Sequence, residues 1–417
     1  MTEVALRCPA CEYEIKDESF VYCPMCGSRF DGKSKETGVY YLEKIKYLWE
    51  RQEGGGLLYK NFKSVRQSGI FPYKKVKPIR TELGDFSHIH LFNLRTYSFL
   101  YFSPQSVRDM YLMGKLIGCY TAESALKTLR LESLASSLQK TGLFWKIFEN
   151  RKVKEAIRTG WIATGGGLLD VTKTNAKKRD VYFDLRDTAL SVLPGMSEPN
   201  CSIASSIFCG HAEALFDGFW DKVEIKCERD GESCCEFRMY LHEKEEEPVV
   251  YVPQKDEVEV VLDKIVDDLR SRKRLRKELD DFLYIITPQC YNYFLLSMSH
   301  GHEILSKHSG VISGERIASN AGLDDSDATF AYARDLFSYL KAGILHEPIE
   351  QGDRLLLRMD ESVYASGVSN IGLKLDVFLA GIIEGALRQA TGEKWQVDET
   401  KCLANGDDFC EFSCNKV

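Results

Sequence analysis

Apolar positions recur every three or four residues in two well-separated stretches, residues 203–216 and 373–387, and this spacing predicts two amphipathic helices. After each stretch the sequence changes to strand-forming residues, a turn and a second strand-forming run. The turns hold Asp-Gly at 230–231 and Asn-Gly at 405–406, dipeptides that favour tight hairpins. The pattern therefore predicts a helix followed by an antiparallel hairpin, twice, which is typical of an α+β fold.

A third helix is predicted to begin near Asp256. Its apolar face consists of five residues at helical spacing: Val258, Val261, Leu262, Ile265 and Leu269. Residues 270–277 follow with six basic side chains in eight positions, and we interpret them as a solvated helix face. The acidic stretch that precedes this helix predicts a linker at residues 246–257.

Comparison of the chain with itself reveals one sequence formula in two places: G-x-x-E, a spacer, then E-x-K-C-x3-G-x3-C-E-F. The first copy runs from Gly210 to Phe237 and the second from Gly381 to Phe412. The spacer between the glycine and the first cysteine is four residues longer in the second copy. We infer two tandem copies of one domain, each of roughly 150 residues.

This formula resembles the 4-vinyl reductase (4VR) domain, which is also described as hydrocarbon-binding. The resemblance covers residues 95–245 and 258–417, and it implies helices packed on an antiparallel sheet, similar to the TRAPP transport-particle subunits and the haem-NO-binding domains. It also implies a small-molecule sensor or carrier whose buried apolar cavity holds a hydrophobic or aromatic ligand. The family's motif positions are occupied by two matching sets of residues: Glu224, Cys227, Cys235 and Glu399, Cys402, Cys410.

The resemblance carries expectations about partners as well. Because TRAPP-like folds pair side by side, the two copies are expected to form a pseudo-dimer within the chain, or the chain to form a homodimer. The family is often coupled to transcription factors, so a protein partner and a role as a regulator are expected.

The paired cysteines of the two hairpins have three open roles. The first role is packing as small buried apolar side chains, the second is cycling between dithiol and disulfide, and the third is metal binding. Two thiols alone do not complete a tetrahedral zinc site, so a metal would need a further ligand, for which Glu224, Glu399 and His211 are the candidates.

The chain has 14 cysteines among its 417 residues. Its N-terminus lacks the basic-then-apolar pattern of a signal peptide, so a cytoplasmic location is expected, where cysteines serve more often as metal ligands than as disulfides. Two C-x-x-C pairs near the N-terminus supply the four thiolates that Zn²⁺ favours. They predict a zinc ribbon over residues 1–31, with these metal ligands: Cys8, Cys11, Cys23 and Cys26.

Charge separates the ribbon from the segment that follows. Residues 1–31 carry three basic and six acidic side chains, whereas residues 33–80 carry twelve basic and four acidic ones with aromatic residues between them. Such a composition suits a nucleic-acid or anionic membrane surface, but we favour a connecting segment, residues 32–94, with a solvated charged face. The net charge of −7 argues against one large nucleic-acid-binding face, and no apolar run is long enough to span a membrane.

These observations predict a cytoplasmic sensor that binds a small hydrophobic or aromatic molecule and acts through a protein partner. One alternative is a reductase or thiol-dependent enzyme of the 4-vinyl reductase type, although no flavin, nicotinamide, Walker or H-E-x-x-H motif is present. A second is a nucleic-acid-binding regulator or assembly scaffold that uses the ribbon. No catalytic residue is predicted, and the candidates for the cavity lining are Met113, Phe294, Met298, Phe337 and Tyr339.

Overall fold

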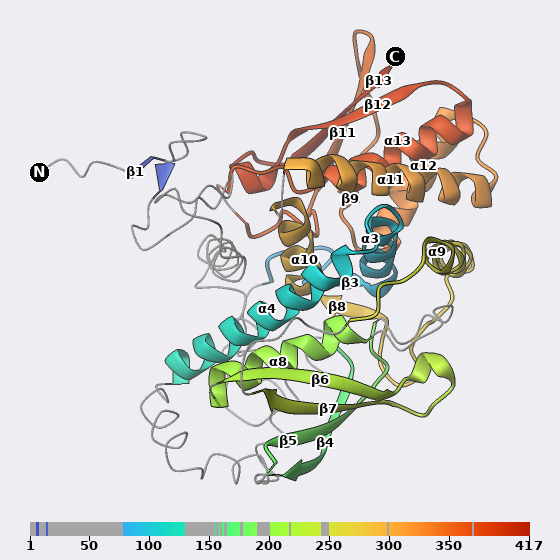
Figure 1. Ribbon diagram of the computed structural model, residues 1–417. Helices are drawn as coiled ribbons and strands as arrows, with labels where there is room; N and C mark the ends of the chain where they lie inside the picture. Colours follow the sequence, from blue (N-terminus) through green and yellow to red (C-terminus); the bar gives the residue numbers. More distant parts are fainter. Residues whose placement is uncertain are drawn as a thin grey trace, which may run out of the picture.

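The computed structural model describes thirteen parts of the chain, residues 6–7, 14–15, 78–129, 154, 158, 161, 165–175, 178–189, 201–216, 218–242, 250–297, 300–368 and 371–417 (Figure 1). Strands β1 (Leu6–Arg7) and β2 (Glu14–Ile15) pair antiparallel on either side of the first C-x-x-C pair. Most of segment 33–80 lies outside the described residues, as do the four predicted ribbon ligands: Cys8, Cys11, Cys23 and Cys26.

The first half of the chain, taken here as residues 78–242, contains a four-stranded antiparallel sheet in the order β4-β5-β7-β6. Helix α8 (Ser202–Phe216) packs against β6 and against α4 (Ser106–Leu129). The strands of this sheet are β4 (Leu168–Asn175), β5 (Asp180–Arg186), β6 (Phe219–Lys226) and β7 (Cys235–His242).

The second half, residues 250–417, repeats this arrangement. Its sheet runs β10-β11-β13-β12, and β9 also pairs with β11. Helix α13 (Val377–Thr391) packs against β12 and against α11 (His300–Ala321), and α12 (Ser326–Tyr339) packs on α13. The strands are β9 (Ile344–Leu345), β10 (Ile349–Gln351), β11 (Arg354–Asp360), β12 (Trp395–Lys401) and β13 (Cys410–Lys416). The predicted mixture of helices and antiparallel sheets is therefore confirmed, and each predicted hairpin follows its predicted helix.

The two halves meet through segments that lie far apart in the sequence. Strand β3 (Phe86–His88) pairs antiparallel with β8 (Phe282–Tyr284), and α3 (Ile89–Phe102) and α10 (Ile286–Ser297) follow these strands (Figure 1). Helix α3 packs against α11 and against α9 (Lys255–Arg270) of the second half. The predicted face of α9 is buried there, at Val258, Val261, Leu262, Ile265 and Leu269. One hydrophobic core therefore extends across both halves.

Two short arms, arm 1 (residues 79–86) and arm 2 (residues 275–282), reach from each half into the other. Arg80 of arm 1 is fully buried, and its guanidinium donates hydrogen bonds to the carbonyl oxygens of Lys341 and Glu361 in the second half. Arg276 of arm 2 is 2% exposed and donates to the carbonyl oxygen of Gly165 in the first half, at 2.7 Å. Each guanidinium therefore donates hydrogen bonds to backbone carbonyl groups of the opposite half.

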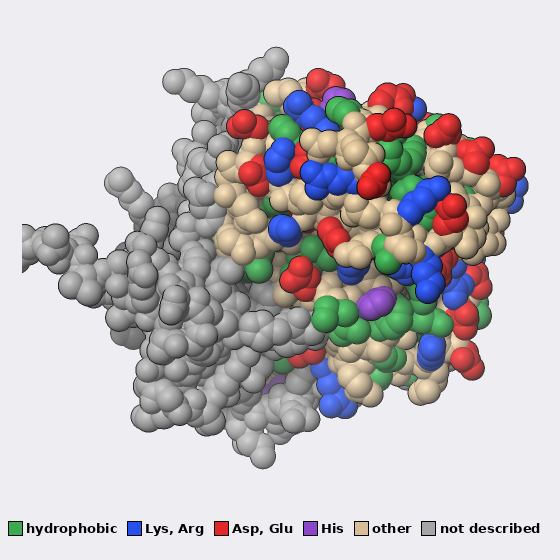
Figure 2. All heavy atoms as spheres, turned by 90° about the horizontal axis from the view of Figure 1, so that it is seen from above, with side chains coloured by type: hydrophobic (Ala, Val, Ile, Leu, Met, Phe, Trp, Pro, Cys, Tyr) green, Lys and Arg blue, Asp and Glu red, His purple; other side chains and the backbone are tan. Residues whose placement is uncertain are grey.

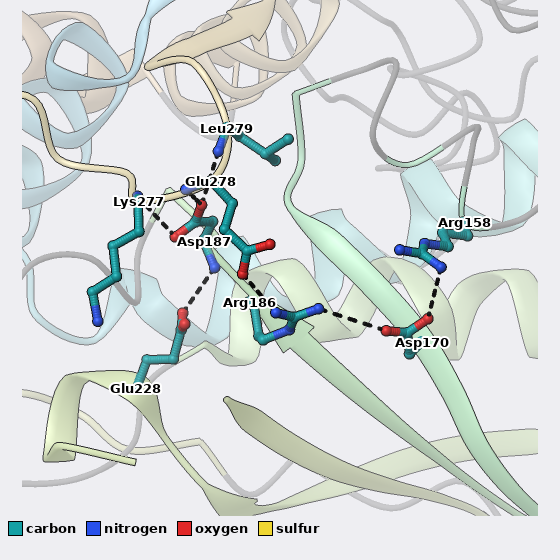
Figure 3. A network of polar contacts seen from close by, with 8 residues as sticks. All are labelled: Arg158, Asp170, Arg186, Asp187, Glu228, Lys277, Glu278 and Leu279. Carbon is teal, nitrogen blue, oxygen red and sulfur yellow. Dashed lines mark hydrogen bonds and ion pairs between the residues drawn. The ribbon is translucent and has the colours of Figure 1, made fainter. Parts of the chain in front are cut away.

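A carboxylate in each half receives the opposite arm. Asp187 accepts hydrogen bonds from the backbone N–H groups of Lys277, Glu278 and Leu279, as Figure 3 shows. In the same way, Glu361 of the second half accepts from three consecutive residues of arm 1, namely Thr81, Glu82 and Leu83. Asp187 and Glu361 both have positive φ, 53° and 51°, so the same turn follows β5 and β11.

The arms share the sequence R-x-E-L-x-D-F, which begins at Arg80 and again at Arg276. We did not predict this repeat, because both copies lie in basic stretches that suggest solvated charge. The interpretation of residues 270–277 as a solvated helix face is wrong in two respects: α9 ends at Arg270, and Arg276 is buried. Only the more exposed members, such as Arg274, fit that interpretation.

Glycines at the helix crossings correct the register of the predicted repeat. A Cβ atom on Gly210 would lie 1.7 Å from the carbonyl oxygen of Lys115, and one on Gly385 would lie 1.9 Å from that of Val311. Gly210 of α8 therefore occupies the place of Gly385 in α13, one helical turn from the predicted partner Gly381. In this register the spacing from the glycine to the first hairpin cysteine is the same in both halves, so the four-residue difference arose from pairing Gly210 with Gly381.

A buried pair of histidines lies beside the junction of the halves. The rings of His88 and His90 stack with centroids 4.7 Å apart, and His88 Nε2 lies 3.2 Å from the hydroxyl of Tyr339. Burial lowers the pKa of His88 to about 4 and that of His90 to about 3. Both rings are therefore neutral in the folded protein at physiological pH.

This burial predicts a specific acid sensitivity. The unfolded chain protonates His90 below a pH of about 6.5, and the folded chain does so only near pH 3, so acidification favours unfolding in the interval between. Between pH 7 and pH 5, His90 is expected to cost about 2 kcal/mol of the free energy of unfolding. The His90→Ile variant introduces the residue found at the matching position 286 of the second half. Between pH 7 and pH 5, its free energy of unfolding, measured in urea, should fall by about 2 kcal/mol less than that of the wild type. The exposed His308→Asn variant should keep the wild-type loss, and an equal loss in all three proteins would contradict the prediction.

Candidate metal centres

The hairpin of the first half closes around a third cysteine, Cys201, which directly precedes α8. Cys227 follows the end of β6, and Cys235 is the first residue of β7. The Sγ atom of Cys201 lies 3.8 Å from that of Cys227 and 3.4 Å from that of Cys235, and the last two sulfurs are 3.6 Å apart. Sulfurs bound tetrahedrally to one zinc ion stand ~3.8 Å apart, so this spacing suits a single metal.

Glu224 of β6 completes the first cluster. One carboxylate oxygen, Oε2, accepts a hydrogen bond from the backbone N–H of Cys201, while Oε1 is buried with no hydrogen-bond partner among the described residues. Ligand atoms of all four residues lie within 4.8 Å of one another. Burial, with a contribution from Cys227, raises the pKa of Glu224 to about 8. A cation would replace the protons of this cluster and satisfy the remaining oxygen.

The turn that carries Cys227 is shaped for a ligand knuckle. A 3-10 turn, η1 (Glu228–Asp230), follows this cysteine and ends at Gly231, whose φ of 92° favours glycine. The backbone N–H of Glu228 points at Cys235 Sγ, at 3.4 Å. In the second half, η2 (Leu403–Asn405) and Gly406, with a φ of 96°, have the same geometry. An N–H donor aimed at a sulfur stabilises the thiolate form that a metal needs.

The second cluster has an aspartate in the place of Cys201. Asp376 directly precedes α13, and its ligand atoms lie within 4.8 Å of those of Glu399, Cys402 and Cys410. Its backbone N–H donates to Glu399 Oε2 at 2.8 Å, and Ser362 Oγ donates to its Oδ1 at 2.6 Å. The other two carboxylate oxygens, Asp376 Oδ2 and Glu399 Oε1, are buried, and in the part of the chain that the structure describes the thiols of Cys410 and Cys402 act on these carboxyls.

Two buried carboxyl groups so close together cannot both ionise freely. Burial raises the pKa of Asp376 to about 6, and burial together with the charge of Asp376 raises that of Glu399 well above its usual value. Hydrogen bonding between the thiols lowers the pKa of Cys402 and raises that of Cys410. This cluster offers two oxygens and two sulfurs, whereas the first offers one carboxylate and three sulfurs. It therefore suits a divalent cation with a weaker preference for sulfur.

The structure brings the predicted hairpin residues together as two separate sets, one in each half. Cys201 and Asp376 were not predicted as ligands from the sequence, although each stands 26 residues before the first hairpin cysteine of its half. His211, a predicted candidate for the further ligand, is not part of the cluster; its Nδ1 lies 2.7 Å from the carbonyl oxygen of Ile207. The structure therefore supplies the third and fourth ligands that two thiols lack.

The predicted cavity-lining residues fall mostly in the core shared by both halves. Met113, Phe294 and Phe337 are each at most 1% exposed, Tyr339 is half-buried, and Met298 lies outside the described residues. A hollow of about 380 Å³ lies elsewhere, between α9, α11 and α13, and is lined mainly by polar side chains such as Asp263, Glu315 and Arg316. On the face drawn in Figure 2, acidic and basic side chains are interspersed over the described part of the chain.

A family match falls in the second half. Residues 355–416 match the V4R domain family, and this stretch contains the whole second cluster. An uncharacterized protein of Methanocaldococcus jannaschii is 26% identical over 149 residues, which is 36% of this chain and 85% of that protein. Within the described residues, no helix is long and apolar enough to cross a membrane.

Two solved structures are similar at low identity. One is the phenol-responsive sensory domain of the transcription activator PoxR with phenol, at 16% identity and a TM-score of 0.29, covering 36% of this chain and 87% of that one. The other is an H-NOX protein from S. oneidensis in the Fe(II)NO ligation state, at 17% identity and a TM-score of 0.22, covering 42% of this chain and 82% of that one.

Proposed function

We propose that this protein is a small-molecule sensor built from two V4R-type units, one in each half, which reports ligand binding to a protein partner. The observation that carries the proposal is the recurrence of the same helix, hairpin and four-residue cluster. The second occurrence lies within residues 355–416, which match the V4R domain, and the first repeats it strand by strand.

We further propose that the two clusters hold metal ions as structural clamps. In the first half, three thiolates and Glu224 suit zinc. A bound ion would tie the start of α8 to both strands of the hairpin, because the ligands come from these three elements. The buried oxygens without hydrogen-bond partners among the described residues, such as Glu224 Oε1 and Glu399 Oε1, support this role, since a bound cation would satisfy them.

The ligand is proposed to bind in the apolar interior where the halves meet. The core there is continuous, and it contains Met113 from the first half and Phe294 and Phe337 from the second. An apolar interior of this composition would surround a hydrophobic or aromatic molecule and keep it from water.

Metal analysis of the purified protein tests the clamps. We expect one ion for each hairpin cluster and one for the ribbon, so three per chain, falling to two in the Cys8→Ser/Cys11→Ser variant. A wild-type value of one, falling to zero in that variant, would show that the hairpin clusters bind no metal.

Ligand analysis tests the sensor. Native mass spectrometry before and after denaturing extraction should reveal a co-purifying organic molecule, or hydrophobic compounds should raise the melting temperature. If neither result is obtained over a broad set of aromatic and aliphatic compounds, the sensor function is wrong.

The sulfur distances also favour a second candidate function, thiol-based redox sensing. Cys201 and Cys235 are close enough to form a disulfide after a small movement. Peroxide would be the oxidant: it would take two electrons and the two thiol protons from the pair and be reduced to two water molecules. Mass spectrometry of peroxide-treated protein distinguishes the two functions. A reversible Cys201–Cys235 disulfide in metal-loaded protein supports redox sensing, and protection of both thiols supports the clamp.

A further inference from the structure

Arg95 of α3 is a buried cation that reaches from the first half into the second. It is 3% exposed, and its guanidinium lies over the rings of Phe99 and Phe378, at 5.3 and 4.9 Å from their centroids. Its Nε donates to Asn292 Oδ1 at 3.2 Å, and its Nη2 donates to Ser306 Oγ at 2.8 Å. The guanidinium is therefore held in place by neutral groups and aromatic faces.

No carboxylate forms an ion pair with Arg95 in the described part of the chain, although Asp376 acts on the neighbouring Tyr364. Arg80 and Arg276, which are also buried, are different, because Arg80 is near Asp85 and Glu361, and Arg276 is near Asp281 and Asp187. For Arg95, the hydroxyl of Tyr364 is the group that favours the charged form of the guanidinium. Burial lowers its pKa only to about 10, so the side chain remains a cation at neutral pH. A buried, unbalanced cation is costly, which indicates that an anion is missing from its surroundings.

Buried polar atoms without hydrogen-bond partners in the described part of the chain occur on Arg95 and on residues of the second half. Arg95 Nη1, the hydroxyl of Tyr364 and Gln289 Oε1 are all buried, and none has a hydrogen-bond partner within the described ranges. Tyr364 acts electrostatically on Arg95, and Gln289 Nε2 donates to the carbonyl oxygen of Ser366, two residues along the chain from Tyr364. A guanidinium N–H and a tyrosine hydroxyl together form a donor pair suited to a carboxylate.

Of the two matching positions in the described halves, only one carries an arginine. Counting from the shared R-x-E-L-x-D-F sequence, the position that matches Arg95 in the second half is Tyr291. The halves therefore differ here in charge, and only the neighbourhood of Arg95 offers a cation to a bound molecule.

We propose that the protein binds an organic carboxylate in its interior. The carboxylate accepts hydrogen bonds from Arg95 Nη1 and the hydroxyl of Tyr364, and the apolar body of the molecule packs on Phe99 and Phe378. This inference rests on the proposed sensor function and gives the chemical class of its ligand. A singly charged group suits the site because one cation and one hydroxyl face it, with aromatic rings beside them.

The test uses the full-length, metal-loaded protein and matched pairs of probes. Benzoate is compared with benzamide, and decanoate with decanamide, by calorimetry and by the shift of the melting temperature. We expect at least one carboxylate to bind ten-fold or more tightly than its neutral amide. The Arg95→Met variant should abolish this preference, and Tyr364→Phe should reduce it several-fold. The exposed Arg108→Met variant is the matched control and should bind as the wild type does.

The outcomes separate this inference from the function on which it rests. Amides that bind as tightly as carboxylates, or a carboxylate preference that survives in Arg95→Met, would overturn the inference while leaving the sensor function intact. Failure of all four probes, with no organic molecule released on denaturation, would overturn both. If Arg95→Met does not fold, the wild-type comparison and Tyr364→Phe decide, because neither removes the buried cation.

Discussion

The Cys201→Ser variant is expected to lose one metal ion per chain and about 3–5 kcal/mol of its free energy of unfolding. In the proposed clamp, Cys201 supplies the ligand that joins α8 to the hairpin, and its loss opens a site whose other groups are buried and close together. Metal analysis and urea unfolding of the wild type and the variant measure the two quantities.

Two further variants make this result specific. Cys290→Ala removes a buried cysteine that lies outside both clusters, so it should keep the full metal content. Cys201→Asp introduces the residue that occupies the matching position 376, and it should retain the ion with lower affinity. If Cys201→Ser binds as much metal as the wild type, the first cluster is not a metal site.

The Arg276→Met variant is expected to be destabilised by about 3–5 kcal/mol, although position 276 lies in a strongly basic stretch. Its guanidinium donates to the carbonyl oxygens of Gly165, Asp280 and Phe282, and these acceptors would lose a buried charged donor. Hydrogen exchange of the backbone amides of arm 2 should accelerate at the same time, because Arg276 fixes this arm to the first half.

Arg274→Met provides the matched control, since Arg274 stands two residues away on the surface and makes one hydrogen bond, to the carbonyl oxygen of Leu279. Its effect should remain within about 0.5 kcal/mol. Equal effects of the two variants would mean that the basic stretch acts as a whole and that the buried guanidinium has no special part.

Local sequence patterns were sufficient to predict the elements that frame the clusters. The apolar spacing of α8, α9 and α13 is a property of each helix alone, and the repeated E-x-K-C formula spans only a hairpin. Both patterns can be recognised in one sequence because they lie among residues that are close together along the chain. The hairpin cysteines were therefore found, and the mixture of helices and antiparallel sheets followed from them.

The residues that were missed depend on contacts between distant segments. Cys201 and Asp376 differ in type, so identity between the halves does not reveal them, and their common position before a helix becomes visible only with the helix boundaries. Arg80 and Arg276 belong to stretches whose charge suggests exposure, and nothing local indicates that they bind carbonyl groups of the opposite half. For the same reason, the unbalanced charge of Arg95 is apparent only from its surroundings.

The crossed arms determine what would happen if the chain were cut between its halves. Arg80 completes the interior of the second half, and Arg276 completes that of the first. Two fragments produced by a protease between residues 243 and 249 should therefore remain associated through the arms and through the pairing of β3 with β8. Covalent continuity through that stretch is then dispensable for assembly, and the two pieces depend on each other as the subunits of an obligate heterodimer do.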